Sequence, residues 1–413
     1  MTAGSSQLAW RLRQAREASG LSQEQVAGRL EVARVTITQI EQGRRSVSDA
    51  ELQRFAGIYA KPVKWFYEPP AHEVDDEGVA ALFRAAPELE YDDAIKVQVE
   101  RYAEIAREMR QLEDLLLVVR DVFVPAGYAL DVPRSKWDAI QQGSRVAREE
   151  RRRLDLGDAP IGDFAELLDT QGIRAVSSTL PEDVSGVTIR QPDAGPIIIV
   201  NKAHLHVRQR FSFAHEYAHV LLDRGHTGIV SRASQRNEIL EIRANAFAAS
   251  FLLPASAVRG FAASVGKGLP SRLSADVFDE EGVVNARRRV RPRSQSIQIY
   301  DVVQLAARYG VSHSTALYRL KNVRPPLVSD DEFARLKRLV DSDAPLKARA
   351  ALGFPDSDKR EHESPGTMSR FVALAVEAYR QKQIDRAWLQ KVARLANADC
   401  SELERLAAGM EAP

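Results

Sequence analysis

The segment at residues 211–225, FSFAHEYAHVLLDRG, contains an H-E-x-x-H pattern inside an otherwise apolar run. The chain has only 8 His among 413 residues, so chance matches to this pattern number on the order of 0.01 in a chain of this length. His215 and His219 are four residues apart, which places them one turn apart on the same face of a helix, where both can bind one ion. The segment therefore predicts a metal site on a buried helix, in preference to two core histidines that bind nothing.

Length and composition limit the setting of such a site. At 44% hydrophobic residues over 413 positions, the chain can form two or three packed cores, so we expect a multidomain globular protein. The formal net charge is only +1, and any contact with nucleic acid must come from a local patch. The single cysteine, Cys400, excludes an intrachain disulfide and a cysteine-ligated zinc finger, which leaves His and carboxylates as metal ligands.

The apolar runs of the chain are short. The N-terminus lacks an apolar signal core, and LLLVV and PIIIV fall far below the roughly 20 residues that a membrane helix requires. We therefore expect a cytoplasmic protein that makes no contact with a membrane.

A catalytic zinc ion needs a third protein ligand and an open position for water. Residues 237–255, NEILEIRANAFAASFLLPA, predict a helix with one face of polar and small residues: Glu238, Glu241, Ala244, Asn245 and Ala248. Alanines on this face permit close packing against the helix that carries the histidines. The pattern favours Glu241 as the third ligand, whereas Glu238 lies a turn earlier and is expected to stay solvated.

The two segments RQRFSFAHEYAHVLL and EIRANAFAASFLLP together resemble the ImmA/IrrE family of zinc metallopeptidases, over residues 161–254. In that family an E-x-x-A-N helix supplies the third ligand. The resemblance implies an α+β, zincin-like metallopeptidase domain that binds Zn²⁺ through His215, His219 and Glu241, with Glu216 as the catalytic base. It also implies a protein substrate, often a helix-turn-helix repressor. The mixed helix and strand patterns between residues 161 and 200 agree with an α+β layout.

A second signal lies near the N-terminus, in SQEQVAGRLEVARVTITQIEQGRR at residues 22–45. Ser22 and Gln25 form a capping box before a short helix, and a tight link leads to a second helix whose Val35 and Ile40 are expected to face inward. This is helix-turn-helix geometry. Polar side chains on the second helix and at its exit can meet base edges and phosphates. The residues expected to bind DNA are Gln23, Arg34, Thr36, Thr38, Gln39, Arg44 and Arg45.

The segments LSQEQVA and ITQIEQGRR closely resemble the XRE, or lambda-repressor-like, DNA-binding domains, over residues 7–67. The resemblance implies an all-α domain bound to a double-stranded operator. The Ser or Thr that usually opens the recognition helix is replaced here by Ala33 or Arg34. The alternative interpretation is a small helical domain that serves protein contacts only.

Breaks in composition and periodicity divide the chain into six segments. We expect a helix-turn-helix domain at 1–68, a helical connector at 69–135, the metallopeptidase core at 136–262, a basic flexible segment at 263–297, a helical segment like a helix-turn-helix at 298–350 that packs on the peptidase, and a helical C-terminal region at 351–413.

Three further features of the sequence bear on the site. The run GPIIIVN is a candidate edge strand for an extended substrate, or else a core strand. The group that stabilises the oxyanion is sought among nearby residues, namely His204, His206, Arg208, Arg210 and Tyr217. Of these, His204 and His206 are expected to be surface loop residues. The segment VSHSTALYRL imitates a recognition helix, but we expect it to pack on the catalytic core.

These observations predict a DNA-binding transcriptional regulator with a zinc-dependent endopeptidase domain. It would cleave a repressor, a related partner or itself in a stress response, and we expect it to act as a homodimer. The alternative is a transcription factor whose peptidase-like domain senses a metal or an effector without proteolytic turnover.

Overall fold

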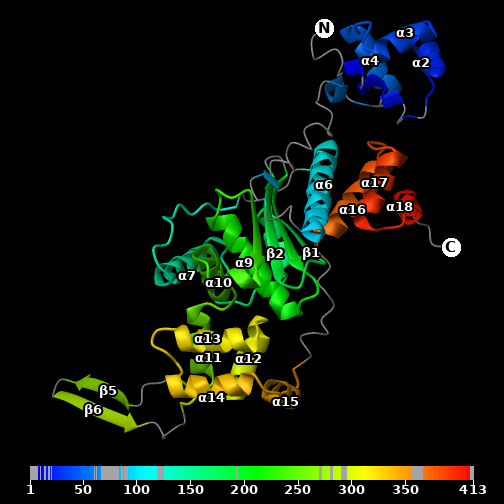
Figure 1. Cartoon of the computed structure of the whole chain (residues 1–413). Coiled ribbons are helices and arrows are strands. Elements are labelled where there is room, and N and C mark those ends of the chain that lie inside the picture. The colour runs from blue at the N-terminus through cyan, green and yellow to red at the C-terminus, as the bar shows by residue number, and fades with distance from the viewer. Residues whose placement is uncertain are drawn as a thin grey trace.

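The computed structural model describes residues 8–66, 92–118, 125–268, 295–354 and 366–409, apart from positions 10, 14, 17, 18, 20, 60, 62, 192 and 193 and the side chains of 64 and 65. It also describes residues 83, 84 and 87 and the backbone of 272–279 and 282–289. A four-stranded sheet with helices on both faces forms the centre of the chain, and helical units precede and follow it along the sequence (Figure 1).

The N-terminal unit contains α2 (Gln23–Leu30), α3 (Arg34–Glu41), α4 (Asp49–Tyr59) and the short 3-10 helix η1 (Val63–Phe66). The predicted capping box begins α2: the Ser22 hydroxyl accepts a hydrogen bond from the backbone N–H of Gln25 at 3.1 Å, and the Gln25 side chain accepts one from the backbone N–H of Ser22 at 2.8 Å. Helix α3 begins after Ala33, which provides no side-chain cap.

The expectation that Val35 faces inward is wrong. Val35 is 64% exposed, whereas Ile37 and Ile40 are buried in the core of the N-terminal unit. Positions 37 and 40 are three residues apart and share one helix face, and position 35 falls on the opposite side. The inward face of α3 therefore starts two residues later than the sequence pattern suggested.

The sheet contains β1 (Arg174–Ser178), β2 (Val184–Gln191), β3 (Gly195–Asn201) and β4 (Gly228–Arg232), in the order β1-β3-β2-β4. Strand β3 pairs parallel with β1 and antiparallel with β2, so the run GPIIIVN is a core strand and the edge-strand alternative is wrong. Its side chains are apolar on both faces, as expected for a strand covered on both sides. The edges of the sheet are β1 and β4.

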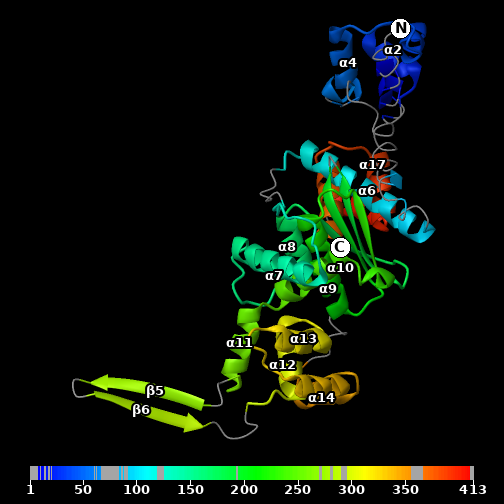
Figure 2. The same ribbon diagram turned by 60° about the vertical axis from the view of Figure 1, so that its left-hand side comes forward.

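One face of the sheet is covered by α9 (His206–Leu222) and α8 (Phe164–Thr170), followed by α10 (Ile239–Leu252) and α7 (Lys136–Arg153) (Figures 1 and 2). Ile198 and Val200 of β3 point to this side and share a core with Ala214 and Ala218 of α9. Helices α7 and α10 approach closely at Gly143, where a Cβ atom would collide with the carbonyl group of Arg243.

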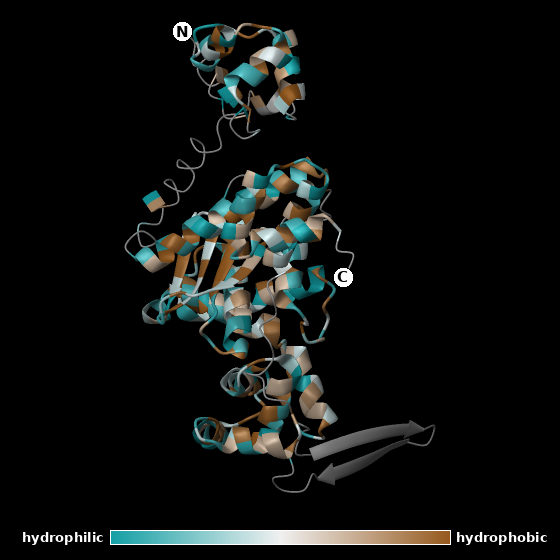
Figure 3. Ribbon diagram, turned by 90° about the vertical axis from the view of Figure 1, so that its right-hand side faces the viewer, coloured by the Kyte–Doolittle hydropathy of each residue, from teal (hydrophilic) through white to brown (hydrophobic). Residues whose placement is uncertain are grey.

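The other face is covered by α6 (Asp93–Leu115), α16 (Gly366–Arg380) and α17 (Arg386–Ala396), with α18 (Cys400–Ala407) beside them. Buried Glu113 of α6 binds Arg174 of β1 at 3.5 Å and Arg370 of α16 at 3.3 Å. Segments separated by more than 200 residues thus share one core with the sheet. Apolar residues of the strands point to both faces of the sheet, as the brown stretches of the strands in Figure 3 illustrate, which explains why both faces are covered.

The chain continues after α10 with α11 (Ala255–Ser264), α12 (Ile299–Tyr309), α13 (His313–Asn322), α14 (Asp330–Val340) and α15 (Ala344–Ala351). Apolar residues of α12 and α13 belong to the same core as α9 and α10. Arg319 of α13 donates to the carbonyl group of Leu253 at 2.8 Å and to the Ser250 hydroxyl at 3.2 Å. The segment that imitates a recognition helix therefore packs on the core that contains α9 and α10 and turns Arg319 inward.

Part of the predicted basic flexible segment has regular backbone structure. Strands β5 (Arg272–Asp279) and β6 (Gly282–Arg289) form an antiparallel hairpin with Arg272 opposite Arg289. Residues 290–294, which complete the basic run, lie outside the described residues.

Within the described part of the chain, no single helix has the length and apolar character needed to cross a membrane. The bent pair α10 and α11 meets that criterion by length and composition alone.

Candidate metal centre

Helix α9 carries the H-E-x-x-H residues through the interior of the domain. Nearly every residue from 209 to 221 is buried, because the helix lies between the sheet and α10. Near its carboxyl end, the Arg190 guanidinium of β2 donates to the carbonyl groups of Val220 and, at 3.4 Å, His219. A cation at this end of a helix offsets the negative end of the helix dipole, so Arg190 fixes α9 to the sheet.

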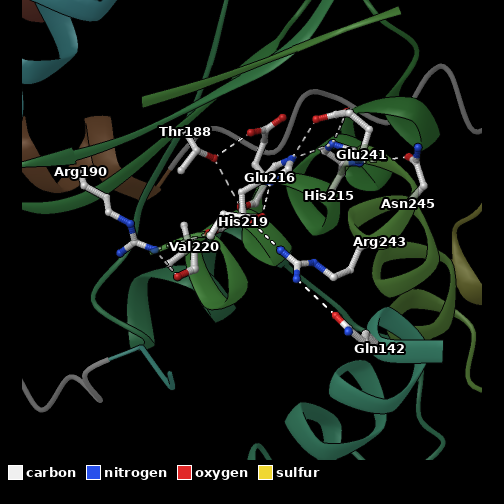
Figure 4. Close-up of polar contacts among 11 residues, drawn as sticks. Gln142, Thr188, Arg190, His215, Glu216, His219, Val220, Glu241, Arg243 and Asn245 are labelled. Atoms are coloured by element: carbon white, nitrogen blue, oxygen red, sulfur yellow. Dashed lines mark hydrogen bonds and ion pairs between the residues drawn. The ribbon is translucent and has the colours of Figure 1, made fainter. Parts of the chain in front are cut away.

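The side chains of His215, His219 and Glu241 point toward one another (Figure 4). The Nε2 atoms of the histidines lie 3.1 Å apart, and the Glu241 oxygens lie 3.2 Å from Nε2 of His215 and 3.3 Å from Nε2 of His219. All three residues are buried, and their candidate ligand atoms lie within 4.8 Å of one another. Two imidazole nitrogens and one carboxylate form a donor set that suits catalytic zinc, so the residues present fit this ion.

The electrostatics of the cluster favour a cation. Burial alone would lower the pKa of His219, but hydrogen bonds to Asp223 and Glu241 raise it to about 10. Burial likewise disfavours the charged form of Glu241, yet its hydrogen bonds to His215 and His219 lower the pKa of this carboxyl well below its usual range. The carboxylates around the histidines therefore stabilise positive charge at the point where the ligand atoms converge.

Each histidine has a second partner that fixes its orientation. Nδ1 of His215 lies 3.0 Å from Oδ1 of Asn245, and Nδ1 of His219 lies 2.8 Å from Oδ2 of Asp223. Both partner atoms are acceptors, so each Nδ1 donates a hydrogen bond and each Nε2 faces the cluster, where it can bind a metal ion once it has lost its proton. Such partners orient metal ligands in many proteins.

Asp223 is itself held in place. The guanidinium of Arg243 donates to its other oxygen and, at 3.3 Å, to the side-chain oxygen of Gln142 on α7. Helix α10 thus carries three residues of the site. Glu241 provides a carboxylate to the cluster, Asn245 accepts from His215, and Arg243 holds Asp223. The sequence reasoning missed Asp223 and Arg243. The signal was the spacing of Asp223, one helical turn after His219.

Glu216 is fully buried and stands apart from the three converging residues. The hydroxyl of Thr188 on β2 donates to its Oε2 at 2.7 Å. Its Oε1 has no hydrogen-bond partner among the described residues. Glu216 follows His215 directly on α9 and therefore offers a second carboxylate beside the cluster without joining it.

Comparison with known families agrees with this geometry. Residues 7–62 match a family described as a helix-turn-helix domain, and residues 168–269 match the family described as the IrrE N-terminal-like domain, peptidase family M78. The chain is a helix-turn-helix protein fused to an IrrE-like, metallopeptidase-family domain. No curated protein matches the chain.

The IrrE-like match includes β1 to β4, α9 and α10, and hence every residue of the cluster. It does not include α6, α7 or α16 to α18, although these helices cover the sheet and support α10. In this chain, the IrrE-like core is completed by segments on both sides of the matched region.

The five residues considered for an oxyanion group do not join the cluster. Arg210 donates to the carbonyl groups of Ile161 and Gly162 at 2.6 and 2.7 Å, and the Tyr217 hydroxyl donates to Glu150. His206 is half-buried at the start of α9, and Arg208 is exposed.

The expectation that His204 lies in a surface loop is wrong. It is 8% exposed, and burial lowers the pKa of its imidazole. The short connection from β3 to α9 draws it inward, because the Gln209 side chain donates to the His204 carbonyl group at 2.7 Å.

The helix-turn-helix domain presents its predicted DNA-binding residues unequally. Arg34, Gln39 and Arg44 are exposed, and Thr36 is half-buried. Arg34 lies 3.8 Å from Glu24, and both side chains are largely solvated. The positions most accessible to DNA are therefore at the start, middle and exit of α3.

Other predicted DNA-binding residues brace the domain. The hydroxyl of Thr38 donates to the side-chain oxygen of Gln23 at 3.1 Å, and the Gln23 amide donates to Glu41 at 2.9 Å. These bonds join α2 to α3. Arg45 forms an ion pair with Glu51 of α4 at 2.7 Å.

Proposed function

We propose that the protein is a DNA-binding regulator whose IrrE-like domain is a zinc endopeptidase. The observation that carries the proposal is the convergence of His215, His219 and Glu241, with the buried carboxylate of Glu216 next to them but outside the ligand set. Structural zinc sites fill four positions with protein ligands, whereas catalytic sites use three and leave one open.

Nε2 of His215, Nε2 of His219 and the Glu241 carboxylate would hold the zinc ion. When bound, zinc lowers the pKa of a water molecule and polarises a peptide carbonyl. Glu216 acts as the general base: its Oε1 takes a proton from the attacking water and returns it to the leaving amine. The buried surroundings strengthen this exchange, because charges interact more strongly where water is excluded.

An extended peptide can reach the site along β4. Strand β4 forms an edge of the sheet and pairs with β2, the strand that also contacts Glu216. Edge strands bind extended segments through backbone hydrogen bonds, and pockets for alternate side chains provide selectivity. We propose that β4, rather than the strand GPIIIVN, is the edge strand that binds the extended substrate.

The helix-turn-helix domain places this activity at an operator. The exposed residues of α3 read base edges and phosphates, and two copies of the chain occupy a two-fold site. The substrate is a protein bound nearby, a helix-turn-helix repressor or the chain itself, because fusion raises the local concentration of the peptidase. Cleavage would then relieve repression in the cytoplasm in response to a stress signal.

Glu216→Gln tests the catalytic proposal. The variant is expected to keep about one zinc ion per chain, since Glu216 is not a ligand, and to lose both cleavage of the partner and derepression of the operator. Elemental mass spectrometry and a reporter gene provide the two readouts. Normal derepression by a zinc-loaded Glu216→Gln protein would exclude hydrolysis as the regulatory event.

The burial of the cluster favours one other candidate. Glu216 and His219 are almost completely shielded from solvent, which also suits a domain that senses a metal or an effector without turnover. In that case zinc removal alters operator affinity, whereas Glu216→Gln leaves regulation unchanged.

A further inference from the structure

Strand β2 contacts α9 through alternate residues, which lie on the same face of the strand. Gly186 lies against the side chain of Glu216, Thr188 donates to its carboxylate, and Arg190 binds the last carbonyl groups of the helix. Figure 4 shows Thr188 and Arg190 extending toward α9. The strand therefore sets both the position of the helix and the orientation of one carboxylate on it.

The contact between Thr188 and Glu216 is buried on both sides. Thr188 is 3% exposed and Glu216 is 0% exposed. The Thr188 hydroxyl lies 2.7 Å from Oε2 of Glu216 and 3.4 Å from the Glu216 backbone carbonyl oxygen, so the carboxylate is its nearer acceptor. One oxygen of the carboxylate is thereby occupied, and Oε1 is left without a hydrogen-bond partner among the described residues.

Gly186 provides the room for this arrangement. A Cβ atom at position 186 would lie 2.6 Å from Oε1 and 2.8 Å from Cγ of Glu216. Both distances are shorter than nonbonded contacts allow, so any side chain would displace the carboxylate. The backbone of β2 can approach Glu216 because this residue is glycine.

We propose that Thr188 is a positioning residue: it binds Oε2 of Glu216 and so assigns Oε1 as the oxygen that exchanges protons, in the space that Gly186 leaves. The inference rests on the proposed role of Glu216 as the base. A general base must hold its acceptor atom within hydrogen-bond reach of the proton that it removes. Without the hydroxyl, the carboxylate can rotate and present either oxygen, or neither, to the reacting water.

Three substitutions separate positioning from structural support. Thr188→Val has nearly the same shape but no hydroxyl, Thr188→Ser keeps the hydroxyl, and Ser185→Ala removes a hydroxyl that donates to the Ser231 carbonyl group instead. All three should retain zinc, because none alters a ligand. Zinc content and the midpoint of thermal unfolding show whether each variant is folded.

With fluorescein-labelled casein as substrate, Thr188→Val should lower kcat about tenfold with little change in KM. The loss is smaller than the roughly 10²–10⁴-fold rate increase that a general base contributes, because Glu216 itself is still present. Thr188→Ser should recover most of the rate, and Ser185→Ala should behave as wild type. A Thr188→Val enzyme with wild-type kcat would overturn the assignment, as would a Thr188→Ser enzyme no better than the valine variant.

Binding of acetohydroxamate to the zinc-loaded proteins gives a readout without turnover. A hydroxamate chelates zinc through two oxygens and shares a proton with a neighbouring carboxylate. Its affinity should fall in Thr188→Val and in Gly186→Ala, in the same direction as in Glu216→Gln, and return in Thr188→Ser. If the hydroxamate affinities follow this pattern but the protein cleaves no substrate, the positioning role of Thr188 is supported and the endopeptidase proposal fails. If the enzyme is active but Thr188→Val binds the hydroxamate as tightly as wild type, only the positioning role is rejected.

Discussion

Nδ1 of His219 lies 2.8 Å from Oδ2 of Asp223, the residue that directly follows the end of α9. Because a carboxylate can only accept here, the contact holds the imidazole in the tautomer that presents Nε2 to Glu241. Arg243 in turn holds Asp223 from the neighbouring helix. Arg243 also donates to Gln142, so three residues outside the candidate ligand set, Asp223, Arg243 and Gln142, support the orientation of His219.

Asp223→Ala is expected to weaken zinc binding by about tenfold to hundredfold, the usual effect of removing a partner that orients a ligand. The zinc dissociation constant, measured by competition with a chromogenic chelator, tests this expectation. Asp183→Ala is the control, because Asp183 forms an exposed ion pair with Arg232 away from the ligands. Equal dissociation constants for the two variants would show that His219 needs no support from Asp223.

Glu241→Ala should lose stoichiometric zinc after dialysis, whereas Glu238→Ala should retain it. Glu241 lies against both histidines, while Glu238 precedes α10 and is exposed. Removing one of three protein ligands leaves too few donors for a stable tetrahedral site. Elemental analysis of the dialysed proteins decides between the two glutamates. Loss of zinc from Glu238→Ala but not from Glu241→Ala would instead identify Glu238 as the third ligand.

The sequence sufficed for the three candidate ligands, which lie on two neighbouring helices. The spacing of His215 and His219, and the small residues around Glu241, lead directly to the group of converging side chains seen in the structure. Asp223, at four residues from His219, obeys the same periodicity and was available to that reasoning.

Contacts that no periodic pattern indicates could not be foreseen in this way. Thr188 and Glu216 are 28 residues apart and belong to a strand and a helix, and no periodic pattern relates them. The same holds for Glu113, which joins α6 to β1 and α16. On α3, Val35 and Ile37 are both apolar, so the sequence alone does not tell which of the two side chains is buried. The packing of the domain shows that it is Ile37.

Ile37→Ala should destabilise the helix-turn-helix domain by about 2–5 kcal/mol, the cost of deleting buried methyl groups. Val35→Ala should change its stability by less than about 0.5 kcal/mol, because Val35 is exposed. Hydrogen exchange of the α2 to α4 amides in the full chain measures this domain separately from the others. A larger effect at Val35 than at Ile37 would reverse the assignment of the inward face.

Gly143→Ala is expected to destabilise the packing of α7 on α10 by about 1–3 kcal/mol, since overpacking forces backbone shifts. The added methyl group would collide with the Arg243 carbonyl group, close to the residues that support Asp223. Gly260→Ala on α11 is the matched control: no atom lies within 4 Å of its added Cβ, and alanine should stabilise that helix by about 0.4–1 kcal/mol. Protection of the α10 amides against exchange should fall only in Gly143→Ala.

Arg34→Ala and Gln39→Ala should each weaken operator binding by about 1–3 kcal/mol if these side chains read base edges. Both are exposed on α3, in contrast to Gln23 and Thr38, which bind each other. Arg44→Ala should act differently. As a phosphate contact, it should weaken binding to all sequences alike and reduce the slope of log K against log salt by about 1.

Titration of operator and scrambled DNA at several salt concentrations separates the two kinds of contact. Arg308→Ala is the control and should bind as wild type, because Arg308 is an exposed arginine of α12, in the helical unit after the IrrE-like domain. Full operator affinity in both Arg34→Ala and Gln39→Ala would remove α3 from the role of recognition helix. A loss of affinity equal on operator and scrambled DNA would instead assign these two residues to the phosphates, because contacts that read bases must discriminate between sequences.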